Sequence, residues 1–108
     1  MAGPVFAVLE PTADSWNTVY TITAGNYGIL SVNIANTSAS AISFRLAATT
    51  IATPNNSEMI EYNLSLAGYS AYERTGLVLT AGYIIKIYPV TSAGLVIQVY
   101  GFEETNPV

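Results

Sequence analysis

The sequence predicts an all-β protein, a single domain in which eight short antiparallel strands form a two-sheet sandwich. Apolar residues alternate with polar or small residues, which places one set on each face of a strand. Val, Ile, Thr and Tyr, which strands prefer, are abundant, and no stretch shows a sustained helical period with caps. Turn signals recur at about the 8–12-residue spacing that is typical of sandwiches and barrels.

The predicted strands lie, in order, near residues 4–9, 16–22, 28–36, 41–49, 58–66, 70–78, 83–89 and 95–102. The alternation is clearest in the third, fourth, fifth and eighth strands, with apolar sets Leu30, Val32 and Ile34; Ile42, Phe44, Leu46 and Ala48; Ile60, Tyr62, Leu64 and Leu66; and Leu95, Ile97 and Val99. The other strands are the stretches between turn signals, which are Glu10–Pro11, Ala24–Gly25–Asn26, Asn36–Thr37–Ser38, Thr53–Pro54–Asn55–Asn56, Ala67–Gly68, Ala81–Gly82 and Ser92–Ala93–Gly94. Eight short strands in a domain of this size favour a jelly-roll-like sandwich.

Two turns share the sequence Thr-Ala-Gly, at residues 23–25 and 80–82. Each joins an apolar strand to the next one. A turn that requires a positive φ at glycine explains both occurrences.

The two ends of the chain differ from the middle. Residues 1–15 contain Pro4, Pro11 and Asp14 and are interpreted as an N-terminal arm with one short strand. Such an arm either reaches a neighbouring subunit or frays. Residues 103–108 are polar and nearly end in proline, which predicts a C-terminal tail after the last strand.

The composition excludes several classes of function. The 108 residues carry a net charge of −4, and only 9% of them are charged, against about 25% in ordinary soluble domains. With no Cys and no His, we expect no zinc or haem site, no disulfide, no thiol nucleophile and no His-centred triad. Three cationic residues are too few for a nucleic-acid partner, and no apolar run reaches the ~18 residues of a membrane helix.

A surface with so few charges is weakly hydrated, which favours a chain that lies against neighbouring molecules. The alternative is a small neutral β-protein that binds nothing.

No constellation predicts catalysis. Among the seven acidic residues, only Glu61 and Glu73 are expected in mid-strand on adjacent strands, where two carboxylates could face each other. Arg45 and Arg74 are near them in the pattern, so cross-strand ion pairs are the preferred explanation. There is no Asp-rich calcium loop and no phosphate-binding glycine loop, so we expect no enzyme, no small-molecule substrate, no cofactor and no metal.

Tyrosine is the remaining candidate for binding, because it is enriched at protein interfaces. The interface candidates in the C-terminal half are Tyr69, Tyr72, Tyr83 and Tyr88, and those in the arm are Pro4, Val5 and Phe6. The tyrosines are explained by packing between strands, by a subunit contact or by a flat sugar-binding face. The single tryptophan, Trp16, is expected to fill the core at the start of a strand.

A series of short motifs between about residues 16 and 104 resembles small virion proteins of tailed bacteriophages, cyanophages included. The motifs are Val19–Gly25, Val32–Asn36, Phe44–Ala47, Ile60–Tyr62, Glu73–Gly76, Leu79–Gly82 and Tyr100–Glu104. The chain departs from the pattern at Tyr83, where the second turn usually continues with Asp. Losing that Asp removes a turn hydrogen bond and puts an aromatic side chain at the rim.

The resemblance implies a β-sandwich that serves as a capsid cement or decoration protein, often as a trimer between capsomers, or as part of a tail or baseplate. It implies no catalytic residues. The expected function is therefore a non-enzymatic virion protein, assembled in the host cytoplasm, with the major capsid protein and its own copies as partners in a homotrimer. A tail or baseplate component and a host-glycan-binding module are the alternatives.

Overall fold

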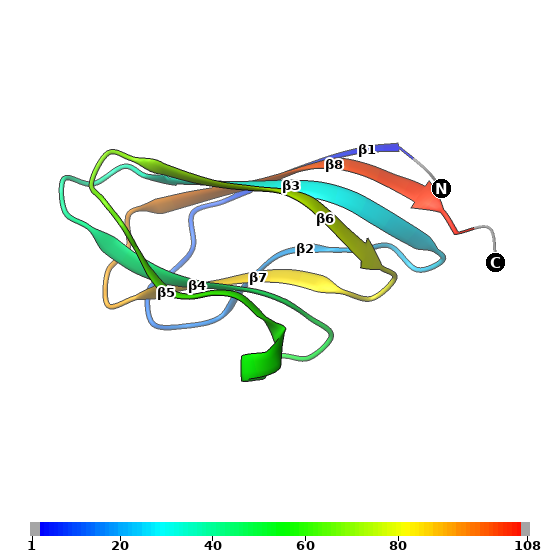
Figure 1. Cartoon of the computed structure of the whole chain (residues 1–108), viewed down its shortest axis with the longest axis horizontal. Helices are drawn as coiled ribbons and strands as arrows, with labels where there is room; N and C mark the ends of the chain where they lie inside the picture. Colours follow the sequence, from blue (N-terminus) through cyan, green and yellow to red (C-terminus); the bar gives the residue numbers. More distant parts are fainter. Residues whose placement is uncertain (1–2, 107–108) are drawn as a thin grey trace.

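The computed structural model describes residues 3–106, which form eight strands in two four-stranded antiparallel sheets (Figure 1). The strands are β1 (Gly3–Leu9), β2 (Asn17–Thr21), β3 (Asn26–Asn36), β4 (Ile42–Thr49), β5 (Met59–Leu66), β6 (Ala71–Thr80), β7 (Ile84–Val90) and β8 (Leu95–Thr105). A single turn of 3-10 helix, η1 (Asn56–Glu58), precedes β5. The predicted fold class is confirmed, and each predicted strand lies where alternation and turn signals placed it.

The strand order is β1-β8-β3-β6 in one sheet and β2-β7-β4-β5 in the other. The first strand thus pairs with the last, the second with the seventh, the third with the sixth and the fourth with the fifth. This is the pattern of one long hairpin rolled into two layers, the arrangement of a jelly roll. Figure 1 shows the two layers, with the start of β1 and the end of β8 at the same end of the sandwich.

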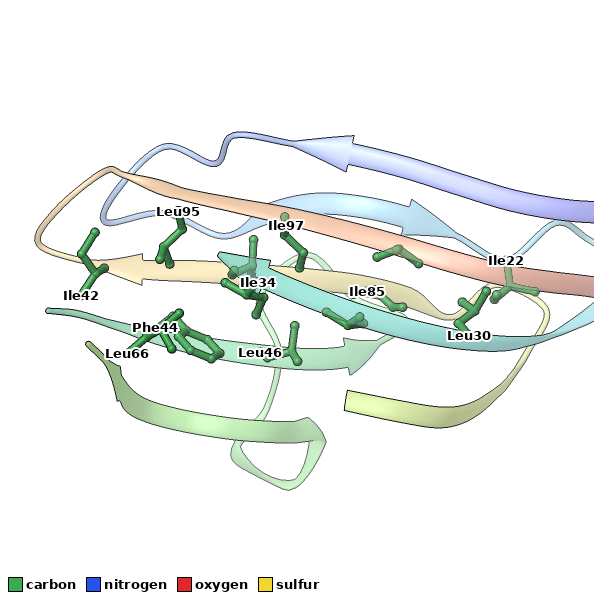
Figure 2. Close-up of a cluster of buried hydrophobic side chains, with 13 residues drawn as sticks. Ile22, Leu30, Ile34, Ile42, Phe44, Leu46, Leu66, Ile85, Leu95 and Ile97 are labelled. Carbon is green, nitrogen blue, oxygen red and sulfur yellow. The ribbon is translucent and has the colours of Figure 1, made fainter. Parts of the chain in front are cut away.

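The core lies between the two sheets and is built by the inward half of each alternating pattern (Figure 2). Its buried side chains are Ile22, Leu30, Val32, Ile34, Ile42, Phe44, Leu46, Leu66, Ile85, Ile87, Leu95, Ile97 and Val99. Each such aliphatic or aromatic side chain contributes about 1.5–3 kcal/mol by leaving water. Phe44 is the largest of them, and its ring meets that of Tyr72 edge-on at 5.4 Å between centroids.

The two Thr-Ala-Gly segments form matching turns side by side. Gly25 has φ +83° and Gly82 has φ +84°, and in each turn the residue after glycine donates its N–H to the threonine carbonyl. Ile22 links the turns, because its N–H donates to the Tyr83 carbonyl and its own carbonyl accepts from Gly82. The positive φ expected at both glycines is confirmed.

The β5–β6 turn illustrates a different demand on glycine. A Cβ on Gly68 would lie 2.1 Å from the carbonyl oxygen of Ala39, so no side chain fits there. The positive φ of the same turn falls on the next residue, Tyr69, with φ +57°. Tyr69 is 76% exposed, so the ring gains little from packing to offset the strained backbone.

The structure contains the short strand expected in the N-terminal arm and corrects the start of the predicted C-terminal tail. Residues 3–9 of the predicted arm form edge strand β1, paired with β8 from Gly3↔Glu103 to Leu9↔Ile97, because their alternation matches the pleat of the sheet. The predicted tail begins too early, since β8 continues to Thr105 and Glu103 lies inside the sandwich. Residues 1, 2, 107 and 108 lie outside the described residues.

Candidate binding faces

The seven predicted interface residues do not form one surface. Pro4 and Phe6 point outward from β1, whereas Val5 points inward and packs against the core. Tyr72 and Tyr83 also pack against the core. Tyr69 is exposed at the β5–β6 turn, and Tyr88 lies on the outer surface of the opposite sheet.

Part of the outer surface of the β1-β8-β3-β6 sheet is apolar. The strand register aligns Pro4, Phe102, Ile29 and Val78 in a row that crosses all four strands. Phe6 and Val8 extend this row along β1. We call these six residues the apolar face. Phe6 is 68% exposed, Val78 65% and Phe102 56%, which is unusual for large apolar side chains that lie together.

Hydrogen-bonded polar groups border the apolar face. Tyr100 pairs with Phe6 across β8 and β1, and the Tyr100 hydroxyl donates to Glu73 Oε2 at 2.9 Å. This hydrogen bond raises the pKa of the Tyr100 phenol, and the little burial and the charge of Glu73 act in the same direction. Glu73 is therefore engaged at the border of a surface that is otherwise suited to contact with another apolar surface.

The outer surface of the β2-β7-β4-β5 sheet carries a different set of side chains. The Arg45 guanidinium lies over the ring of Tyr62 at 4.5 Å and near the ring of Tyr88 at 4.9 Å from its centroid. Trp16 meets Tyr88 edge-on at 5.4 Å, and Arg45 Nε donates to Asn63 Oδ1 at 2.7 Å. We call these five residues the arginine row.

A β-bulge in β5 builds one end of the arginine row. The β4–β5 register shifts between Phe44 and Leu46, so that Tyr62 and Asn63 together stand opposite Arg45. Asn63 has φ +54°, a conformation that asparagine adopts more readily than most residues. Bulges redirect side chains, and this one places a ring and an amide oxygen on the same guanidinium.

The prediction for Trp16 is wrong. Trp16 is half-buried against Tyr88 on the outer surface and does not belong to the buried core. The reason is parity: the next residue, Asn17, pairs with the inward-facing Ile87, so Trp16 faces the other way.

Lys86 lies on the same outer surface as the arginine row. It is two residues before Tyr88 in β7, and it pairs with Thr18 on one side and with Ala47 on the other. It is buried, and its Nζ donates to Thr18 Oγ1 at 2.9 Å. Arg45 and Lys86, two of the three cationic residues of the chain, thus lie on this side of the sheet. Of these two, Lys86 is buried, so Arg45 is the one whose charge lies at the surface.

A carboxylate lies inside the sandwich, at the end where β8 meets the turn after β2. Glu103 is 4% exposed and accepts hydrogen bonds from the Tyr20 hydroxyl, from Asn26 Nδ2 at 2.7 Å and from the Thr23 N–H at 3.3 Å. Burial alone raises the pKa of the Glu103 carboxyl, but these three donors outweigh burial and hold that pKa below its ordinary value.

The same network acts on its tyrosine. Burial, together with the hydrogen bond to Glu103 and its charge, raises the pKa of Tyr20 to about 12. Every group of the network has a partner, so it is suited to holding the end of the sandwich together.

The prediction that Glu61 and Glu73 form ion pairs with Arg45 and Arg74 is wrong, since the structure of residues 3–106 contains no such pair. Glu61 accepts a hydrogen bond from the Tyr72 hydroxyl at 2.8 Å, and Glu73 accepts one from Tyr100. Burial, the Glu61 hydrogen bond and its charge raise the pKa of Tyr72. Tyrosine hydroxyls thus bond both carboxylates, and the Arg74 side chain acts on the Tyr72 phenol, where it opposes the rise in pKa.

Residues 3–106 contain no group of three or more acidic side chains that could hold a metal ion. In the same part of the chain, no helix has the length and the apolar character needed to cross a membrane.

No protein-family model matches the chain, and no curated protein is significantly similar to it in sequence. The resemblance to bacteriophage virion proteins therefore stays a prediction.

Proposed function

We propose that this chain is a non-enzymatic structural protein of a bacteriophage particle. In this proposal it acts as a capsid cement or decoration protein, with the major capsid protein and further copies of itself as partners in a homotrimer. The observation that carries the proposal is the apolar face, a surface of large exposed side chains that spans a whole four-stranded sheet.

The apolar face supports docking on a protein shell for a simple energetic reason. Covering the exposed part of a side chain such as Phe6 contributes about 1–2 kcal/mol. A single contact of this kind is weak once the cost of association is included. On a particle with a repeating lattice, linked contacts raise the effective affinity far above that of one site.

The edges of the sandwich support contacts between copies. Strands β1 and β6 border one sheet and β2 and β5 border the other, and each presents unpaired backbone groups on its outer side. Contacts between subunits in a trimer would cover some of these edges. The low charge of the chain fits a protein whose sides are covered in this way.

The experiment has two parts. Light scattering coupled to gel filtration measures the oligomeric state of the purified chain, and a trimer is expected. Mass spectrometry of separated heads and tails from particles made in cells carrying the gene measures where the protein resides, and heads are expected. A protein that stays monomeric at high concentration and is missing from particles would overturn the proposal.

Point variants connect the result to the apolar face. Replacing Phe6 and Phe102 by Ser should reduce incorporation into particles without unfolding the chain, because both side chains are already exposed. Tyr69→Ser is the matched control, since it removes an equally exposed aromatic ring outside the apolar face. Equal loss in both variants would show that incorporation does not depend on this face.

The second candidate is a tail or baseplate component. The apolar face supports this function equally well. It favours contact with another protein surface, and it does not indicate whether that surface belongs to the head or to the tail. Recovery of the protein with tails, and not with heads, would select it.

A further inference from the structure

We infer that the arginine row is a binding site for an acidic glycan, with the Arg45 guanidinium receiving the carboxylate of a uronic acid. The site consists of Trp16, Tyr88, Arg45, Tyr62 and Asn63, on the sheet surface opposite the apolar face.

The guanidinium is held in one orientation before any ligand arrives. Two phenol rings contact it at 4.5 Å and 4.9 Å, and Asn63 Oδ1 fixes its Nε at 2.7 Å. Within residues 3–106, Arg45 forms no ion pair with a carboxylate, so its two terminal nitrogens keep their donors for a ligand. An immobilised guanidinium with two parallel donors matches a carboxylate, and little side-chain entropy is lost when it binds.

The rest of the chain supports an anionic ligand here. The net charge is −4, yet the carboxylates for which this structure shows hydrogen bonds are engaged with other groups. Glu61 bonds to Tyr72, Glu73 to Tyr100, and Glu103 lies inside the sandwich, while Asp14 and Glu58 accept from the backbone N–H groups of Thr91 and Asn55. Because none of them pairs with Arg45, its guanidinium gives the outer surface of the β2-β7-β4-β5 sheet an accessible positive charge.

The surroundings favour a glycan over a protein segment. A protein hot spot is normally enclosed by contacts that exclude water. On one side, the next outward-facing residues are Ser65, Ser43 and Val90. On the other side they are Thr18, the buried Lys86 and Ala47, so short hydroxyl side chains are interspersed with aliphatic ones. Such a surface offers hydrogen bonds to sugar hydroxyls. A row across four strands is about 14 Å long, enough for several units of one sugar chain.

The choice of a glycan also rests on the proposed function. If the apolar face lies on a particle, the arginine row on the opposite sheet must face away from it, toward whatever surface the particle meets. A polysaccharide that carries carboxylates is the complementary ligand for that position.

The test uses the full-length chain in affinity electrophoresis through gels that contain a soluble polysaccharide. Polygalacturonate and hyaluronate are the acidic probes, dextran is the neutral control, and polyglutamate represents an acidic protein segment. The wild-type chain should be retarded by a uronate polymer and not by dextran, and high salt should weaken the retardation.

Substitutions locate the effect. Arg45→Gln should weaken uronate binding at least about tenfold, as expected for the loss of a charge-assisted pair. Arg45→Lys should restore only part of it, because an ammonium group lacks the planar pair of donors. Arg74→Gln, which makes the same change of charge on β6 of the other sheet, should bind like the wild-type chain, and circular dichroism verifies that all variants are folded.

Three outcomes would overturn the inference: no retardation by either uronate polymer, equal loss in the Arg45 and Arg74 variants, or binding to polyglutamate in place of the uronates. Its failure is distinguishable from failure of the proposed function. Arg45→Gln should enter particles normally, so a chain found in particles without uronate binding refutes only the glycan site. A chain that binds uronates but is missing from particles refutes only the virion assignment.

Discussion

Replacing the buried carboxylate tests whether the Glu103 network holds the end of the sandwich together. In Glu103→Gln, an amide oxygen at the Oε2 position keeps the hydrogen bonds from Tyr20 and Thr23. The new NH2 group then faces Asn26 Nδ2, which donates to Oε1 at 2.7 Å in the wild-type chain. One charge-assisted hydrogen bond is lost and two donors meet in a buried site, which together should cost about 2–4 kcal/mol.

The measurement is urea unfolding followed by far-ultraviolet circular dichroism, with Glu104→Gln as the control. Glu104 is the exposed neighbour on the same strand, and its substitution should change the free energy of unfolding by less than about 0.5 kcal/mol.

The pH dependence gives an independent test of the same network. The folded-state pKa of Glu103 lies below its ordinary value of 4.5, so the carboxylate stabilises the fold fully above that value and progressively less as the pH falls below it. The stability difference between the wild-type chain and Glu103→Gln should therefore narrow below pH 4.5. A difference that stays constant from neutral pH into this acidic range, or a loss under about 1 kcal/mol at pH 7, would refute the reasoning.

Three further predictions concern folding stability and are measured by denaturant titration. Gly68→Ala should cost at least about 2 kcal/mol because its Cβ would lie 2.1 Å from the Ala39 carbonyl oxygen, whereas Gly82→Ala has open space and should cost only about 1 kcal/mol for its positive φ. If both cost the same, steric overlap does not govern the first. Phe44→Ala should cost about 3–5 kcal/mol, since the ring is fully buried, and a loss under 1 kcal/mol would contradict its place in the core. The neutral Tyr20 phenol, whose pKa is raised to about 12, should stabilise the fold below pH 10 and less as the pH rises toward 12, so parallel alkaline profiles of wild type and Tyr20→Phe would count against the network.

The strands could be predicted from the sequence because the pleat imposes a local period of two. Alternation in the eighth strand, at Leu95, Ile97 and Val99, assigns the inward face directly. The same parity continues through Gly101 to Glu103, so it contained the signal for the buried carboxylate. The burial of Glu103 was nevertheless not predicted, because the last residues of the chain are polar. A charged residue is expected inside a sandwich only when it has hydrogen-bonding partners there.

The pairing of distant strands was not predictable from local pattern. The hydrogen bond between Tyr20 and Glu103 joins residues 83 positions apart, and the arginine row takes its members from four strands or their ends. No local pattern states that Arg45 stands opposite Tyr88, or that a bulge adds Tyr62 and Asn63 on its other side. For the same reason, Trp16 was expected in the core.

The sequence by itself determined the strands, the turns and most of the side chains that face inward, because these depend on backbone geometry over a few neighbouring residues. The exceptions are Trp16 and Tyr62, which face outward, and Glu103, which is buried. The tertiary structure alone decided that one sheet surface is apolar and the other carries Arg45 between aromatic rings. Register and sheet order are properties of long-range pairing, and they are selected by the packing of the whole core and not by any one segment.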